Sequence, residues 1–162
     1  NGREGKHTGD GIMASFVKTS DSLDAAMQMQ REAAEHTEQS PDRPVLLKIG
    51  INSGEPISED NDLFGTTVQM TARIVDTASR EEIFVSEIVR GICAGKNYKF
   101  KNRGPYPMKG FEVDPILYEV LWREEEEEEL KEFLSSPCVI FQRAYLFSQM
   151  ITGCLYRAHT VI

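Results

Sequence analysis

The residues best suited to chemistry begin with a lysine and an aspartate four positions apart, Lys6 and Asp10. Gly9 and Gly11 flank the aspartate, and an apolar run over residues 12–16 follows it. Glycines at these positions suit a tight turn between two strands, because glycine tolerates positive φ and close approach to a ligand. An aspartate at the tip of such a turn offers hard oxygen ligands to Mg²⁺ or Mn²⁺. A plain hairpin with a turn-favouring aspartate is the alternative interpretation.

A second group of polar residues surrounds an amphipathic helix predicted over residues 64–78. Gln69 and Arg73 are four positions apart, so both side chains project from one face of that helix. Asp62 precedes the helix, and Lys109 lies in a loop before the last predicted strand. Taken singly, Asp62 and Lys109 are ordinary surface charges. The apolar stripe predicted to face the core consists of Phe64, Val68, Ala72, Val75 and Ala78, widened by Met70 and Ile74.

These residues lie among alternating strands and helices, which predicts an α/β (α+β) protein with a mixed sheet. A helix over residues 23–38 is expected to be capped by Ser20 or Ser22, and a second, from Ser86 to residue 94, by Ser86. That second helix is expected to turn Ile88, Val89 and Ile92 inward. The acidic residues 58–62 are predicted to form a loop or a short hairpin tip. Strands are predicted over residues 12–17, 45–52, 82–85, 98–102, 106–108 and 116–122.

Composition limits the classes of partner. The chain has 18 Lys and Arg against 26 Asp and Glu, a formal net charge of −8. This balance argues against a nucleic-acid partner, because such surfaces cluster basic residues on one face. Three cysteines without metal-ligand spacing indicate a reducing compartment. The polar, glycine-rich start at Asn1 is no signal peptide, and we expect the chain to be a piece of a longer protein.

The character of the sequence changes after Trp122. Arg123 precedes six consecutive glutamates, and because like charges four positions apart repel, residues 123–136 are predicted to be an acidic linker, with a weak helix as the alternative. Residues 137–162 form an apolar tail to which no structure is assigned. The longest uncharged run there, residues 144–156, is too short to span a bilayer, so no membrane span is expected.

Four segments, in order, resemble the catalytic domain of class III adenylate and guanylate cyclases, especially of the bacterial type. The resemblance covers residues 3–122, and the tail has no counterpart in it. It implies a ferredoxin-like mixed sheet of the nucleotide-cyclase type, with helices on one face. The segments are KHTGDGIMASF (6–16), LKIGINSGE (47–55), DLFGTTVQMTAR (62–73) and KGFE (109–112).

The resemblance implies a reaction. In this family the ribose 3′-hydroxyl of a nucleoside triphosphate attacks its own α-phosphorus, pyrophosphate leaves, and a 3′,5′-cyclic nucleotide forms. Two divalent ions, Mg²⁺ or Mn²⁺, activate the nucleophile and hold the triphosphate. The site lies between two domains packed head to tail, which implies a homodimer with shared interface sites. Because the nucleotide is intracellular, a cytoplasmic domain is expected.

The resemblance also assigns roles to the polar residues. Asp10 matches one of two metal-binding aspartates, and Lys6 and Asp62 match the pair that reads the purine. A lysine donates to adenine N1 and an aspartate accepts from the 6-amino group, whereas guanine presents the opposite pattern, so ATP is the expected substrate. Arg73 matches the arginine that stabilises charge on the α-phosphate. Lys109 matches a lysine that contacts the terminal phosphates.

Two departures from the family pattern bear on activity. Gln69 stands where the family has an asparagine thought to orient the ribose, and one extra methylene misplaces the amide. The family's first metal aspartate, its strand and the helices after it would precede Asn1, since residues 1–8 already match the second strand. We therefore expect the 162-residue chain alone to have little or no activity, although its parent is a cyclase.

Two other interpretations stay open. The first is a degenerate cyclase-homology module that dimerises and binds nucleotide without turnover, which the glutamine at position 69 and the missing aspartate favour. The second is a related nucleotidyl-transfer fold such as a diguanylate cyclase. The chain has no Gly-Gly-Asp/Glu-Glu-Phe turn, which argues against the second interpretation.

Overall fold

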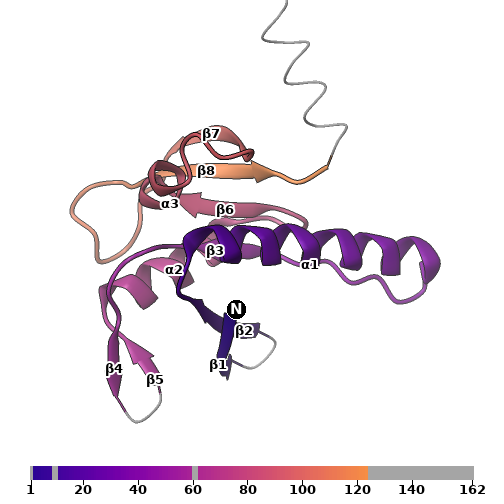
Figure 1. The fold of residues 1–162 in the computed structure, drawn as a ribbon, viewed down its shortest axis with the longest axis horizontal. Coiled ribbons are helices and arrows are strands. Elements are labelled where there is room, and N and C mark those ends of the chain that lie inside the picture. The colour runs from indigo at the N-terminus through magenta and orange to yellow at the C-terminus, as the bar shows by residue number, and fades with distance from the viewer. Residues whose placement is uncertain (1, 9–10, 60–61, 124–162) are drawn as a thin grey trace, which may run out of the picture. The chain divides into compact units, whose positions relative to one another are not determined.

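The computed structural model describes residues 2–8, 11–59 and 62–123, and for residues 3–8, 58–59 and 62 the backbone alone. The chain divides into two units, Asn1–Trp122 and Arg123–Ile162, and the elements all belong to the first (Figure 1). Apart from Arg123, the predicted linker and tail lie outside the described residues. In chain order the elements are β1 (Gly2–Thr8), β2 (Gly11–Phe16), α1 (Thr19–Gln39), β3 (Ile49–Ile51), β4 (Ile57–Glu59), β5 (Asp62–Phe64), α2 (Thr66–Thr77), β6 (Ile83–Ser86), α3 (Glu87–Ile92), β7 (Lys99–Pro105) and β8 (Ile116–Leu121).

The main sheet has four strands in the order β3-β6-β8-β7. β3 pairs parallel to β6, and β8 pairs antiparallel to both β6 and β7. All four residues of β6 are buried, as a short continuous apolar strand at the centre of a sheet requires. The predicted α+β class with a mixed sheet is therefore confirmed, as are the predicted strands that became β6, β7 and β8.

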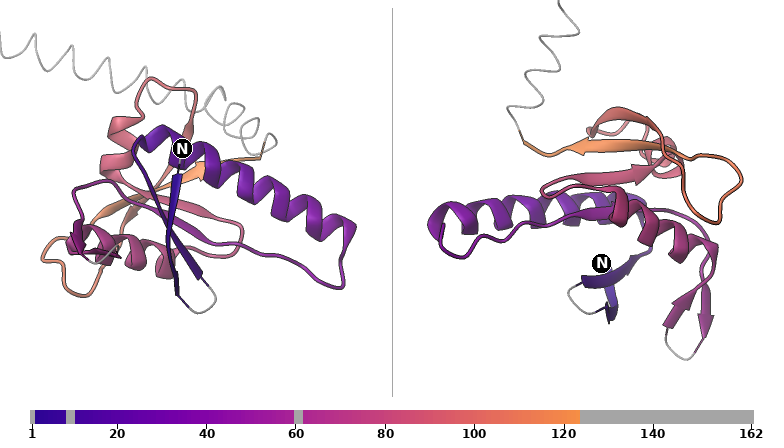
Figure 2. Two further views of the ribbon diagram at one scale, coloured as in Figure 1. Left: turned by 60° about the horizontal axis from the view of Figure 1, so that its bottom comes forward. Right: turned by 180° about the vertical axis from the view of Figure 1, so that it is seen from behind.

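Helices cover both faces of this sheet (Figure 2). Successive side chains of a strand point to opposite faces. Ile83 and Val85 of β6 pack with Leu23 of α1 and Val89 of α3, so these two helices share one face, as expected. Phe84, between them, packs with Ile74 of α2. α2 thus lies on the other face. The prediction that helices cover one face alone was wrong for this helix.

Two hairpins stand apart from the main sheet. β1 and β2 pair antiparallel in their own two-stranded sheet, which matches the strand predicted from residue 12. β4 and β5 form another, with Ile57 opposite Phe64, so the segment predicted as a loop or hairpin tip is a hairpin. In the described part of the chain, no helix combines the length and apolarity needed to cross a membrane.

Three local predictions were wrong. The strand predicted over 45–52 is reduced to β3, because Val45 bonds to the Thr37 hydroxyl through both its backbone N–H and its carbonyl instead of to a strand. The strand predicted over 106–108 is absent from the described structure, where Tyr106 N–H donates to the Pro115 carbonyl across a loop. Neither Ser20 nor Ser22 caps α1, whose N-cap is Lys18.

The buried faces of two helices also differ from the prediction. In α2, Ile74 is fully buried while Ala72, assigned to the central stripe, is exposed. In α3, Ser86 caps the helix as predicted, its hydroxyl accepting from Val89 N–H. Val89 is buried, but Ile88 and Ile92 are 57% and 50% exposed. α3 has six residues, fewer than two turns, so a single position per helix face reaches the sheet.

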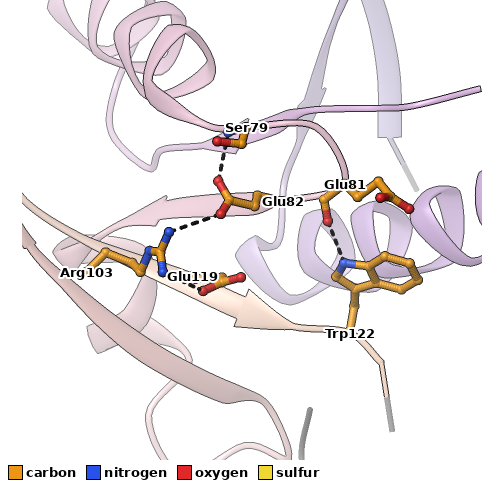
Figure 3. Close-up of polar contacts among 6 residues, drawn as sticks. All are labelled: Ser79, Glu81, Glu82, Arg103, Glu119 and Trp122. Carbon is orange, nitrogen blue, oxygen red and sulfur yellow. Dashed lines mark hydrogen bonds and ion pairs between the residues drawn. The ribbon is translucent and has the colours of Figure 1, made fainter. Parts of the chain in front are cut away.

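A polar network links β7, β8 and the loop that leads into β6 (Figure 3). Arg103 contacts Glu82 at 3.1 Å and Glu119 at 3.6 Å, and its guanidinium lies 5.5 Å from the centre of the Phe84 ring. The other oxygen of Glu82 accepts from Ser79 N–H at 2.8 Å. These residues come from the loop after α2 and from three strands, so the network lies on the same face of the sheet, the Phe84 face, as α2.

Candidate functional site

The helix α2 presents Gln69 and Arg73 on its exposed side. Both side chains are exposed and lie one turn apart, while Ile74 on the same helix is fully buried against the sheet. The helix begins after Gly65, whose φ of 103° is in the region that favours glycine, and the Gln69 N–H donates to the Gly65 carbonyl. The buried isoleucine therefore fixes the rotation of the helix that turns the two polar side chains outward.

The end of β3 positions α2 through residues to which sequence reasoning gave no role. Asn52 Nδ2 donates to the Thr67 carbonyl at 3.2 Å, inside the first turn of α2. A Cβ on Gly54 would lie 2.6 Å from Thr67 Oγ1, and a Cβ on Gly50 would lie 2.7 Å from the Val75 backbone nitrogen. A glycine inside a predicted strand is the sequence signal of such a close approach.

Replacing Gly50 by alanine is expected to lower the free energy of unfolding by about 1–3 kcal/mol, because the new methyl group meets backbone that cannot rotate away. Urea unfolding followed by the fluorescence of Trp122, which is buried and is the single tryptophan, measures the change. Gly91→Ala is the matched control, since beyond its own helix no atom of the described residues lies within 4 Å of the place its new methyl group would take. An equal effect of both substitutions would show that β3 does not constrain α2.

Lys109 lies at the corner of a tight turn. The Phe111 N–H donates to the Met108 carbonyl at 3.2 Å, and Gly110 has a φ of 94°, as the third residue of a type II turn requires. Met108 is buried in the same cluster as Ile74 of α2, and Phe111 packs against that cluster. The structure therefore anchors the exposed Lys109 and the helix that carries Arg73 on one apolar cluster.

The strands that carry the two predicted purine-reading residues are in contact. Lys6 lies in β1 opposite Met13, next to an irregularity in the register, and Asp62 is the first residue of β5, opposite Glu59. β5 lies against β1, although their sequences are more than fifty residues apart. The side chains of Lys6 and Asp62, and the whole of Asp10, lie outside the described residues.

Arg73 makes one described ion pair, and that pair is weak. Arg73 lies 3.5 Å from Asp76 one turn later, with both side chains about half exposed or more, and an exposed pair of this kind contributes at most about 1 kcal/mol. Asp76 therefore holds the guanidinium weakly, and a more highly charged anion would displace it at little cost. Among the described residues, no group of three or more His, Cys, Asp or Glu side chains is placed to hold a metal ion.

The sequence matches a known family over most of its length. The family model described as "Adenylate and Guanylate cyclase catalytic domain" matches residues 9–122. A protein of Rhizobium meliloti named "Putative adenylate cyclase 3" is 31% identical over 113 residues, which are 68% of this chain and 19% of that protein. An uncharacterised protein of Mycobacterium tuberculosis is 26% identical over 108 residues, 65% of this chain and 35% of that protein. The chain thus spans about a third or less of these relatives.

Solved structures of cyclase domains share the fold. An adenylate/guanylate cyclase/hydrolase from Silicibacter pomeroyi is 29% identical with a TM-score of 0.69, over 74% of this chain and 72% of that one. The guanylyl cyclase Cya2 is 26% identical with a TM-score of 0.59, over 74% and 68%. The guanylate cyclase domain of RhGC from Catenaria anguillulae, in complex with GTP, is 16% identical with a TM-score of 0.60, over 76% and 74%, and shows the fold alone.

Proposed function

The chain belongs to the family of adenylate and guanylate cyclase catalytic domains, and from that premise we propose that it comes from an adenylate cyclase that converts ATP into 3′,5′-cyclic AMP and pyrophosphate. The observation that carries the choice of adenine is the pair Lys6 and Asp62 on the contacting strands β1 and β5. An ammonium donates to adenine N1 and a carboxylate accepts from its 6-amino group. Guanine would leave both groups facing a like partner, which a polar pocket rejects strongly.

In the proposed reaction the 3′-hydroxyl of ATP gives up its proton to solvent and its oxygen bonds to the α-phosphorus, which closes the ring. The bond from the α-phosphorus to the oxygen that bridges to the β-phosphorus breaks, and pyrophosphate leaves with that oxygen. Arg73 stabilises the negative charge that grows on the α-phosphate oxygens, and its exposed place on α2 leaves it free to reach them. Gln69, one turn earlier, orients the ribose, and Lys109 contacts the terminal phosphates from its turn. The cluster shared by Ile74 and Met108 holds the two elements together.

We propose that the domain requires Mg²⁺ or Mn²⁺, two ions per site in an intact domain, with Asp10 as the ligand that this chain supplies. When bound, such ions neutralise triphosphate charge and activate the nucleophile. The described residues do not by themselves form a cluster that holds an ion. The requirement therefore rests on Asp10 and on the family, and not on the described geometry.

The proposed enzyme is a homodimer in the cytoplasm, where ATP is present. One copy supplies Asp10 and the other supplies Lys6, Asp62 and Arg73. Exposed apolar side chains on the hairpin of β4 and β5 support this assembly, because Ile57 and Phe64, which lie opposite one another, are 64% and 46% exposed in the single copy. A partner that covers this surface would remove apolar area from water.

A second candidate function is a nucleotide-binding, dimerising module without turnover, which the extra methylene of Gln69 favours. The substitution Gln69→Asn, made in the longer parent protein, separates the two. If the chain is an enzyme, shortening the side chain is expected to raise kcat for ATP at least about tenfold, because an amide misplaced by about 1 Å costs up to a hundredfold. Cyclic AMP and cyclic GMP are measured by chromatography after incubation with ATP or GTP and Mn²⁺, and ATP binding by calorimetry.

Gln39→Asn, the same chemical change on an exposed position of α1, is the matched control and should leave kcat unchanged. ATP binding without turnover in the original chain and in both variants would favour the module. Absence of both binding and turnover with either nucleotide would contradict both candidate functions.

A further inference from the structure

A hollow of about 480 Å³ lies between α1 and the segment that leads into β7. It is on the face of the sheet covered by α1 and α3, opposite the face on which α2 packs. Its volume is within the range of small-molecule sites, roughly 300–1,000 Å³. One wall is a stripe of α1 and the other is the chain just after α3. The lining residues are Asp24, Met27, Gln28, Arg31, Lys96, Asn97 and Tyr98.

The apolar part of the hollow is built on the protein core. Met27 and Tyr98 are both partly buried against the cluster that contains Leu23 and Val89. The ring of Tyr98 also lies 6.4 Å from the ring of Phe100. Two fixed, partly exposed apolar side chains therefore offer a rigid surface to the body of an organic molecule.

The carboxylate in the hollow is already engaged. The Tyr98 hydroxyl donates to Asp24 Oδ1 at 2.7 Å and lies 3.3 Å from the Ser20 carbonyl. Burial, and next the hydrogen bond to Asp24, raise the pKa of Tyr98 above its ordinary value of 10, so the hydroxyl stays protonated at neutral pH. Asp24 thus acts as the acceptor that orients the tyrosine ring.

The cations in the hollow are not engaged in the same way. Arg31 donates from Nε to the Trp122 carbonyl at 3.4 Å, which orients the guanidinium and leaves its terminal nitrogens without a described partner. Among the described residues, neither Arg31 nor Lys96 lies within ion-pair distance of a carboxylate. Arg31 on α1 and Lys96 in the segment after α3 thus contribute two cations to the lining of one hollow, in a chain whose net charge is −8.

We propose that this hollow binds a small amphiphilic organic anion, a carboxylate on an aromatic or aliphatic body. The carboxylate bonds to the Arg31 guanidinium and the Lys96 ammonium, which favour it through charge-assisted hydrogen bonds. The body lies on Met27 and Tyr98. The site does not depend on nucleotide chemistry, so an experiment can contradict this proposal without contradicting the proposed cyclase activity, and the reverse.

The test is a titration of the ¹⁵N-labelled 162-residue chain by two-dimensional NMR with three probes of one shape and different charge. The probes are 4-phenylbutyrate, 4-phenylbutanol and 4-phenylbutylamine. The carboxylate is expected to shift the amides of residues 24–31 and 96–98 saturably, and to bind at least about fivefold more tightly than the alcohol or the amine. Inorganic phosphate is expected to bind more weakly than 4-phenylbutyrate, because it does not use the apolar floor.

Arg31→Gln and Lys96→Gln are each expected to weaken binding of 4-phenylbutyrate at least about fivefold, since each removes one charged donor. Arg80→Gln, at an exposed arginine outside the hollow, is the matched control and should bind as the original chain does. The same spectra report whether each variant is folded, and Lys96 lies in an exposed loop where a glutamine is easily accommodated. Equal binding of the three probes, shifts centred on other residues, or unchanged binding in both variants would each overturn the proposal.

Discussion

Replacing Arg73 by alanine is expected to lower kcat for ATP cyclisation about 10²–10³-fold while changing the free energy of unfolding by less than about 0.5 kcal/mol. The guanidinium lies on the exposed side of α2, and its one described ion pair is the 3.5 Å contact with Asp76. The folded state therefore loses little when it is removed. The transition state loses a charged donor at the α-phosphate, so kcat should fall more than the KM for ATP rises. Cyclic AMP production measures the first effect and urea unfolding the second.

Three control variants accompany this prediction: one keeps the positive charge at position 73, one removes a different exposed arginine, and one removes the acid that pairs with Arg73. Arg73→Lys should recover only part of the rate, because an ammonium lacks the planar fork of a guanidinium. Arg80→Ala removes an equally exposed arginine from the turn after α2 and should leave kcat unchanged, as should Asp76→Ala. The background is the longer parent protein, in whichever of its original and Gln69→Asn forms is the more active. A loss at Arg73 no larger than that at Arg80 would remove α2 from the proposed mechanism.

Sequence predicted the strands of the main sheet where the information is local. The buried β6 and β8 are short apolar runs bounded by turn residues, and both were found within one or two residues. The same holds for the Ser86 cap of α3, since a capping hydroxyl acts three residues away in the chain. Elements that depend on interactions within a few residues of the chain were therefore predictable from the sequence.

Residues 45–48 show what local pattern cannot supply. Residues 45–47 are apolar and lead into the alternation of Leu47, Ile49 and Ile51, which is typical of a strand. A strand exists only where another strand accepts its hydrogen bonds. In this fold the Thr37 hydroxyl satisfies both the N–H and the carbonyl of Val45, and the Leu47 carbonyl accepts from Glu81 N–H and Gln30 Nε2. The fold determines which group becomes the hydrogen-bond partner of a backbone N–H or carbonyl, so the sequence of the segment alone does not predict that partner.

The site depends on a similar choice in α2. Its sequence holds two adjacent apolar stripes, one through Val68 and Ala72 and one through Met70 and Ile74, and periodicity does not say which faces the sheet. Ile74 is fully buried and Met70 packs against the same cluster, whereas Ala72 is exposed and Ala78, at the end of the first stripe, is buried. The spacing of Gln69 and Arg73 did predict that they share a face. Gly50 and Gly54 allow α2 to approach closely because they carry no side chain. The sequence did not predict this role, since the helix residues that they contact are known only from the structure.

The contact between β1 and β5 was predictable only through the family resemblance, because no local rule brings together strands so far apart. That contact leads to the second large effect. A chain carrying Lys6→Glu and Asp62→Asn is expected to change the ratio of kcat/KM for ATP to that for GTP at least about a hundredfold in favour of GTP. Glutamate accepts from guanine N1–H and asparagine donates to O6, which reverses the original pattern.

Lys48→Glu with Asp42→Asn is the matched control, since it makes the same two changes at exposed positions away from β1 and β5 and should leave the ratio unchanged. The ratio is insensitive to losses that affect both nucleotides alike, so partial unfolding or a damaged phosphate site does not imitate the effect. Arg73→Ala, in contrast, should lower both rates together, because the α-phosphates of ATP and GTP are the same. An original chain that uses ATP and GTP equally, or a double variant with an unaltered ratio, would show that Lys6 and Asp62 do not read the base, even if Arg73 proves essential.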